Sequence, residues 1–218
     1  MCGRFTLDID ERFYPRFRLE RVIFDFPPNF NVAPGQSTPI IIKEEKREIK
    51  MMNWGFLPPW AKDVTDKFRP INAKVETIDQ KNTFKSALLK QRCIIPANGF
   101  YEWEKTQEGK QPWYFYPKDD NYFAFAGIFS IWKGHGENNP FYSYTILTRQ
   151  ANALVNKMHE RMPLILTPMQ EEIWLDEGNV SNALELVRAE QEIDISLNKV
   201  APLVNSPQNN FPDLIKSI

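Results

Sequence analysis

The hydrophobic pattern of the first two-thirds of the chain is that of β-strands. Runs of β-branched and aromatic residues alternate with short segments rich in Pro, Gly and Asn, which commonly bound strands. The predicted strands are TPIIIK (38–43), REIKMMNW (47–54), RCIIPANGFYEW (92–103), QPWYFYP (111–117), YFAFAGIFSIW (122–132) and FYSYTILT (141–148). The polar segments KDDN (118–121) and KGHGENN (133–139) are expected to be loops or hairpin connections.

Helical periodicity is confined to a few shorter segments. Capping signals support three of them: Asp8 with Glu11, Thr148 as an N-cap, and Thr167 followed by Pro168. The predicted helices are DIDERF (8–13), TIDQKNTFKSALLKQ (77–91), RQANALVNKM (149–158), TPMQEEIWLDEG (167–178) and SNALELVRA (181–189). Because strands and helices do not alternate regularly, the pattern predicts an α+β fold with mostly antiparallel strands.

Composition narrows the class of protein without naming a function. The chain has 218 residues and a net charge of -1, so it can bury a sizeable core and has no global charge that favours nucleic acid. Two cysteines make no disulfide framework, and Cys93 in an apolar run is expected in the core. No CxxC or Cys/His spacing indicates a metal site, and neither a membrane span nor a signal peptide is predicted. We expect a cytoplasmic protein.

Charge is distributed unevenly along the chain. Basic residues outnumber acidic ones over 62–92, and acidic residues dominate 170–194. Such runs are usually solvated faces, although the first could form a local basic surface. The sequence does not show whether the acidic segment meets a partner.

The N-terminal sequence MCGRF places a cysteine directly after the initiating methionine. If Met1 is removed, Cys2 carries both a free α-amine and a thiol. The α-amine has a pKa of about 7.7–8.0 in peptides, so a useful fraction is unprotonated at neutral pH and can attack an aldehyde. The thiol can then close on the imine carbon to give a five-membered thiazolidine. The alternative is that Cys2 is an incidental residue at a frayed terminus.

Four further residues are candidates on local sequence alone. Glu102 lies among aromatic residues, where burial could raise its pKa and allow proton transfer, but Glu104 cannot be distinguished from it by pattern. His159 lies between a predicted helix and a proline-marked strand, where it could act as an acid or base or only interact with a helix end. Asn72, between apolar neighbours, is either a hydrogen-bonding group or a turn residue.

Aromatic residues and the second histidine complete the candidates. Trp54 and Trp60 flank a rigid pair of prolines near basic residues, so they could stack on unpaired bases or belong to the core. His135 is expected at a solvated loop tip. Each of these residues has a plain structural explanation when it is taken alone.

Seven motifs, considered together, favour the functional explanation of these residues over the structural one. In order across residues 1–166 they are MCGRF, NVAPGQ, NWGFLPPWAK, INAKVET, CIIPANGFYEW, ILTRQAN and MHERMPLIL. This set resembles the SOS response-associated peptidase (SRAP) family, which includes the abasic-site crosslinking proteins of bacteria and eukaryotes. The resemblance is weakest over 170–195.

The resemblance implies a fold and a function. The fold would be a single SRAP domain over 1–218, with a barrel-like or open-sandwich core of mostly antiparallel strands and flanking helices. Members lose Met1 by their own limited peptidase activity, bind single-stranded DNA that contains an abasic site, and form a thiazolidine through the exposed cysteine. A Schiff-base intermediate would give a secondary lyase activity. No cofactor, metal or membrane is implied, and we expect a monomer that joins the nucleoid when bound to DNA during the SOS response to DNA damage.

The resemblance also assigns roles to particular residues. Cys2 matches the crosslinking cysteine, Asn72 the asparagine that orients its amine, and Glu102 the acid/base carboxylate. His159 matches a histidine involved in imine chemistry, strand cleavage and crosslink reversal. The expected DNA contacts are Arg4, Lys74 and Arg161 to phosphates, and Pro34, Trp60 and Thr148 along the groove.

One position departs from the family pattern. The family usually has Asn-Ala-Arg where this chain has Asn72-Ala73-Lys74. Lysine keeps the positive charge but lacks the bidentate fork of arginine, so phosphate binding there is expected to be weaker or less oriented.

Two alternatives from other classes stay open. An N-terminal-cysteine amidotransferase also begins Met-Cys-Gly, but it should carry a glutamine-binding loop and a synthase domain, and we expect neither here. A non-covalent single-strand-binding module would show salt-sensitive binding without a covalent product.

Overall fold

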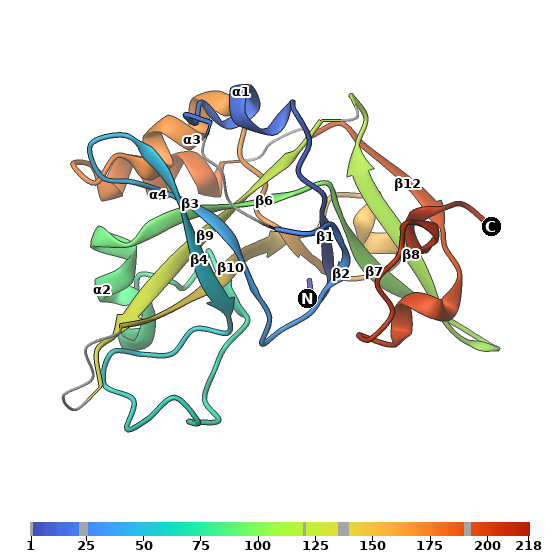
Figure 1. Cartoon of the computed structure of the whole chain (residues 1–218), viewed down its shortest axis with the longest axis horizontal. Helices are drawn as coiled ribbons and strands as arrows, with labels where there is room; N and C mark the ends of the chain where they lie inside the picture. The colour runs from blue at the N-terminus through green and yellow to red at the C-terminus, as the bar shows by residue number, and fades with distance from the viewer. Residues whose placement is uncertain (1, 22–25, 120, 135–139, 190–192) are drawn as a thin grey trace.

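The computed structural model describes residues 2–21, 26–119, 121–134, 140–189 and 193–218, and two β-sheets dominate it (Figure 1). The smaller sheet has five strands, all paired antiparallel. In order across the sheet they are β12 (Ile195–Lys199), β8 (Gly109–Pro117), β7 (Gly99–Thr106), β1 (Phe5–Leu7) and β2 (Asn29–Val32). The sequence run 92–103, predicted as one strand, is split between the two sheets.

The larger sheet has seven strands and carries most of the core. Its order is β11 (Arg161–Pro163), β10 (Phe141–Gln150), β4 (Arg47–Trp54), β3 (Ser37–Lys43), β6 (Arg92–Ala97) and β9 (Phe123–Trp132), with β5 (Asn72–Lys74) paired to β10. β10 runs parallel to β4 and β5, and the other pairs are antiparallel. The sheet curves, since β9 also pairs with β10, but it is not a closed barrel. The predicted mostly antiparallel α+β fold is confirmed.

Helices cover the larger sheet. They are α1 (Phe13–Phe17), α2 (Asn82–Lys90), α3 (Pro168–Leu175) and α4 (Val180–Arg188), with 3₁₀ turns η1 (Val155–Lys157), η2 (Pro202–Asn205) and η3 (Pro212–Ile215). Figure 1 shows α1, α3 and α4 grouped at one end of the molecule, away from the five-stranded sheet. At α3 Thr167 caps the helix and Pro168 opens it, as predicted, and Thr167 also forms a capping box with Gln170.

Three predicted helices are wrong in extent, and one of them, predicted over 77–91, begins only at Asn82. The segment 8–13 does not start a helix at Asp8; α1 begins only at Phe13, and Asp10 instead pairs with Arg12 in the preceding turn. The segment 149–158 contains only η1, and Thr148 lies inside β10 rather than at an N-cap. β10 runs on to Gln150 and pairs with β11, which takes up the first two residues of the predicted helix. The predicted loop tip at His135 lies outside the described residues.

The acidic segment 170–194 is explained in part by ion pairs inside the molecule. Glu171 of α3 pairs with Arg16 at 2.7 Å and with Arg47 at 2.8 Å, and Glu172 pairs with Arg47 at 2.7 Å. We call Arg16, Arg47, Glu171 and Glu172 the arginine–glutamate cluster. It joins α1 and α3 to strand β4, so these carboxylates are structural rather than a solvated face.

Strand β1 brings the N-terminal sequence into the middle of the molecule (Figure 1). It pairs with β2 on one side and with β7 on the other, where Phe5 lies opposite Phe100. At Gly99 a side chain would overlap Tyr114 and the carbonyl of Phe115, so only glycine permits this close packing of the strands. Within the described residues, no helix has the length and apolar character needed to cross a lipid bilayer.

Candidate active site

Cys2 lies buried immediately before β1 rather than at an exposed end. Its side chain is 0% exposed, and its Sγ donates a weak hydrogen bond to the Arg4 carbonyl at 3.8 Å. Burial raises the pKa of the Cys2 thiol well above its usual value, and the negative charge of Glu102 raises it further. The thiol is therefore protonated at neutral pH and needs a base before it can attack.

The pairing of β7 with β1 places Glu102 of β7 near Cys2. The amide of Tyr101 donates to the Arg4 carbonyl at 3.0 Å, which fixes this register beside Cys2. Glu102 is 3% exposed, and burial raises its pKa to about 7. A carboxyl group with this pKa can both give and take a proton at neutral pH. The structure also separates Glu102 from Glu104, whose Oε2 accepts a hydrogen bond from Trp113 at 2.9 Å.

Asn72 approaches Cys2 from the other sheet. It begins β5, opposite Ile146 of β10, and its Nδ2 donates to the Cys2 carbonyl at 2.9 Å. Its Oδ1 is buried and accepts no hydrogen bond from the described residues. A buried acceptor of this kind usually has a partner. An amine on Cys2 would supply one, because it lies only two bonds from the carbon of the carbonyl group that Nδ2 already holds.

His159 lies directly after η1, as the sequence predicts for a junction. Its Nδ1 accepts a hydrogen bond from the Arg161 amide at 2.9 Å, which leaves Nε2 to carry the proton of the neutral ring. Burial lowers the pKa of His159. The imidazole is therefore mostly neutral at pH 7, and it can act as a base at Nδ1 once that nitrogen gives up the Arg161 hydrogen bond.

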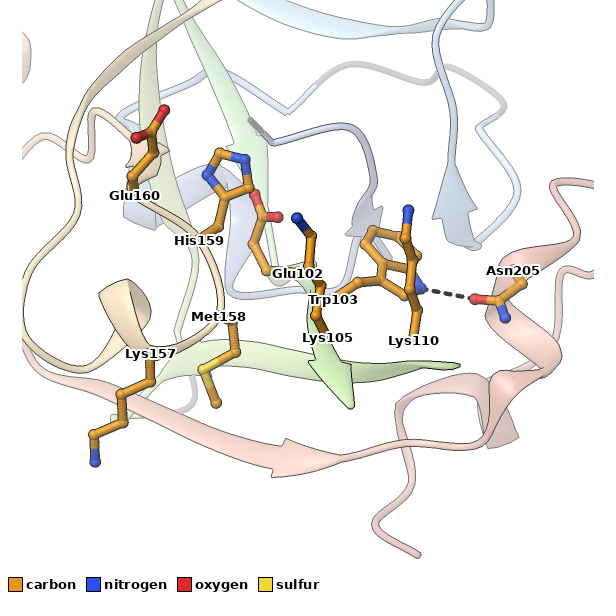
Figure 2. Close-up of a pocket in the computed structure, with 9 residues that line it drawn as sticks. All are labelled: Glu102, Trp103, Lys105, Lys110, Lys157, Met158, His159, Glu160 and Asn205. Carbon is orange, nitrogen blue, oxygen red and sulfur yellow. Dashed lines mark hydrogen bonds between the residues drawn. The ribbon is translucent and has the colours of Figure 1, made fainter. Parts of the chain in front are cut away.

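A pocket of about 900 Å³ joins Glu102 and His159. Figure 2 shows the carboxyl group of Glu102 and the ring of His159 at one end of it, with lysines of the β7–β8 hairpin beside them. Cys2 does not line the pocket; it lies buried behind Glu102. Of the candidates for chemistry, the structure thus brings Cys2, Asn72 and Glu102 together and adds His159 through the shared pocket.

Three of the expected DNA contacts form a second group on β5, β10 and β11. Lys74 lies opposite Thr148, and Thr148 is 0% exposed. Arg161 donates to the Thr148 carbonyl at 2.6 Å and makes a bidentate pair with Glu76 at 2.7 and 2.9 Å. Lys74 is exposed, whereas Arg161 is 8% exposed.

The other three expected contacts are dispersed. Arg4 donates to Asn31 Oδ1 at 2.7 Å and to the Val204 carbonyl at 3.0 Å. Pro34 is exposed in the turn between β2 and β3. Trp60 is 65% exposed and stacks on Phe68, with ring centroids 6.4 Å apart, whereas Trp54 is buried. Among the described residues no hydrogen bond, ion pair or ring contact joins Pro34 or Trp60 to the group around Cys2.

With this geometry in view, we compared the chain with known proteins. The sequence profile described as SOS response associated peptidase (SRAP) matches residues 1–207. The chain belongs to the SRAP family.

Two relatives of the chain are named abasic site processing proteins. The abasic site processing protein YoqW of Bacillus subtilis is 40% identical, and the match covers 100% of both chains. The abasic site processing protein HMCES of Gallus gallus is 31% identical over 88% of this chain and 67% of its own length. A solved structure of a protein from Bacteroides thetaiotaomicron superposes with a TM-score of 0.78 at 26% identity, covering 87% of this chain and 85% of that one.

Sequence reasoning missed two partners in this SRAP site. Glu76 lies within the motif INAKVET, but nothing in a single sequence shows that it faces Arg161. Phe68 pairs with Trp60 from eight positions further along an irregular loop, so no periodicity connects them. Within the part of the chain that is described, no cluster of three or more His, Cys, Asp or Glu residues could hold a metal ion.

Proposed function

We propose that this protein processes abasic sites in single-stranded DNA by a covalent crosslink to Cys2, which removal of Met1 exposes. The observation that carries the proposal is the convergence on Cys2 of Asn72 and Glu102, from opposite sheets. The family membership and the names of the relatives agree with the proposed substrate.

The chemistry follows from the protonation states of the groups. The Cys2 amine adds to the C1′ aldehyde of the ring-opened sugar, and the carbinolamine loses water to give an imine. Glu102, with a pKa of about 7, donates the proton that the leaving hydroxide needs. The carboxylate so formed then helps to remove the thiol proton, since burial keeps the thiol protonated. Sulfur adds to the carbon of the protonated imine, the nitrogen becomes the neutral ring amine with its proton, and Glu102 ends protonated as it began.

Strand cleavage would compete with ring closure. The imine acidifies the C2′ hydrogen, and loss of that proton expels the 3′ phosphate. His159 faces the same pocket with a neutral ring, so we assign it the role of base in this lyase reaction. Asn72 Oδ1 would orient the Cys2 amine, and the peptidase activity would be limited to removal of Met1.

The six expected DNA-contact residues are proposed to hold the strand. Lys74 and Arg4 would contact phosphates, and Arg161 would do so if its pair with Glu76 exchanges. Trp60, exposed and supported by Phe68, offers a face on which an unpaired base can stack. Pro34 and Thr148 would line the groove. The protein would act as a monomer.

A denaturing gel tests the proposed function. The processed protein, checked by intact mass for loss of Met1, is incubated with single-stranded DNA that bears one abasic site. We expect a shifted band that survives heating. Cys2→Ala keeps the amine but lacks the thiol, so it should give a band only after borohydride trapping of the imine.

Cys93→Ala is the matched control, because Cys93 is the chain's other cysteine and is also buried. It should crosslink like the wild type. Absence of a band with the processed wild type would refute the crosslinking function and favour a non-covalent binding module.

A further inference from the structure

The β7–β8 hairpin places two lysines directly opposite each other. Lys105 pairs with Lys110 in the strand register, and both are exposed and line the candidate pocket. Side chains of directly opposed residues lie on the same face of a sheet, and like charges there destabilise the pair. A bound anion would remove this repulsion.

Carboxylates of the same hairpin do not neutralise the lysines. Glu104 precedes Lys105 and therefore points to the opposite face, where it accepts the hydrogen bond of Trp113. The Lys199 ammonium covers the ring of Trp113 on that side, 5.3 Å from its centroid. For the residues that are described, no carboxylate lies within ion-pair distance of Lys105 or Lys110.

The position of the lysine pair relates it to the reacting groups. Glu102 shares the strand face of Glu104, but it lines the same pocket as the two lysines, and Figure 2 shows Trp103 between the two ammonium groups. The Trp103 indole is held in place by its hydrogen bond to Asn205 Oδ1 at 2.7 Å. Glu160, the other carboxylate of the pocket, lies beyond His159. The two lysines thus line the same pocket as Glu102 and His159.

We propose that Lys105 and Lys110 bind phosphates of the DNA strand on one side of the abasic site. This inference rests on the proposed function and adds a binding site to it. Two compact ammonium charges on a strand-anchored hairpin suit a flexible single strand, because each can neutralise a phosphate without a fixed orientation. Binding there would direct the strand so that the sugar enters the pocket at Glu102.

Salt-dependent binding tests the lysine pair without any covalent step. The processed protein binds an oligonucleotide that carries a tetrahydrofuran abasic analogue, which has no aldehyde. For single strands each phosphate contact contributes about 0.7 to the slope of log affinity against log salt, so Lys105→Gln/Lys110→Gln should lower that slope by about 1.4. The control Lys90→Gln/Lys118→Gln removes two other exposed lysines with no ion pair among the described residues and should leave the slope unchanged.

Oligonucleotides with the analogue at either end locate the contact. The affinity lost in Lys105→Gln/Lys110→Gln should appear with strand on only one side, 5′ or 3′, and vanish with strand on the other. An unchanged slope, or equal losses on both sides, overturns the proposal. The melting temperature should not fall, because the substitution removes a repulsion.

Crosslinking of the wild type to an aldehyde-bearing oligonucleotide is measured in parallel. If it fails while the slope still falls, the phosphate-binding pair stands and the proposed function does not.

Discussion

Two buried carboxylates of this protein have opposite surroundings. Glu171 is 1% exposed and lies between Arg16 and Arg47 in the arginine–glutamate cluster. Glu102 is 3% exposed, lies beside a protonated thiol, and has a pKa raised by burial to about 7. Burial therefore does not decide what a carboxylate does. A group matched with cations stays charged and holds elements together, whereas a group whose pKa approaches neutrality can transfer protons.

The largest expected effect is a loss of stability when Glu171, the ion-paired carboxylate, is replaced. Glu171→Ala leaves Arg16 without its counter-charge and Arg47 with Glu172 alone, and it should lower the free energy of unfolding by about 3–5 kcal/mol. Urea denaturation of the variant measures this loss. Glu102→Gln, in contrast, should leave the protein at least as stable at pH 8. Equal destabilisation by both substitutions would remove the distinction between the two carboxylates.

The proposed proton transfer by Glu102 is tested by the rate of crosslinking. Glu102→Gln should slow crosslinking by about 100-fold, the lower range for general acid–base catalysis, while affinity for intact single strands is kept. For the wild type the rate should rise with pH as the amine deprotonates and fall above about pH 7 as Glu102 loses its proton. The falling limb should be missing in the variant. A wild-type rate without that limb contradicts the acid role.

The pH dependence of the free energy of unfolding also distinguishes Glu102 from Glu171. The pKa of Glu102 is raised from 4.5 to about 7 by folding, so the folded state holds more protons between these values. The wild type should therefore lose stability relative to Glu102→Gln as pH rises from about 4.5 to about 7, by no more than about 3 kcal/mol. Paired unfolding curves at pH 4.5 and pH 8 measure the difference. An opposite sign would mean that Glu102 is stabilised as a charge, like Glu171.

The sequence predicted these two carboxylates unequally well. Aromatic neighbours and a recognisable motif indicated Glu102, although only the structure separates it from Glu104. Glu171 lies in an acidic run that gave no sign of its arginine partners, because Arg16 and Arg47 come from distant segments. The capped helix α3 and the β-branched strands were predicted well, since local signals determine them. The helix predicted at 149–158 failed at its start because Arg149 and Gln150 pair with β11, a tertiary effect that helical spacing does not reveal, and only η1 forms in the rest.

A smaller effect is expected at His159, which lines the same pocket as Glu102. His159→Ala should still form the crosslink but reduce strand cleavage and crosslink reversal by at least about tenfold, because its neutral ring is the proposed base. Denaturing gels that separate cleaved from crosslinked strands measure both products. His135→Ala, at the chain's other histidine, is the control. An unaltered cleavage profile in His159→Ala would count against the assignment.

The smallest effect concerns a charge that is exposed rather than buried. Lys74→Arg restores the bidentate group that the family usually has, so affinity for single-stranded DNA should rise about twofold to fivefold. Fluorescence anisotropy at fixed salt measures the change. Because Lys74 is exposed, the melting temperature should stay the same. Unchanged affinity would mean that this position does not contact the strand.

The most direct test of the account is the mass of the crosslinked peptide. The processed protein is crosslinked to abasic DNA, treated with borohydride or left untreated, and digested with a protease and a nuclease. The account predicts one N-terminal peptide that begins at Cys2, joined to the sugar with loss of one water and unchanged by borohydride, as a thiazolidine requires. A peptide that gains two hydrogens on reduction, or one attached through a lysine, would contradict it.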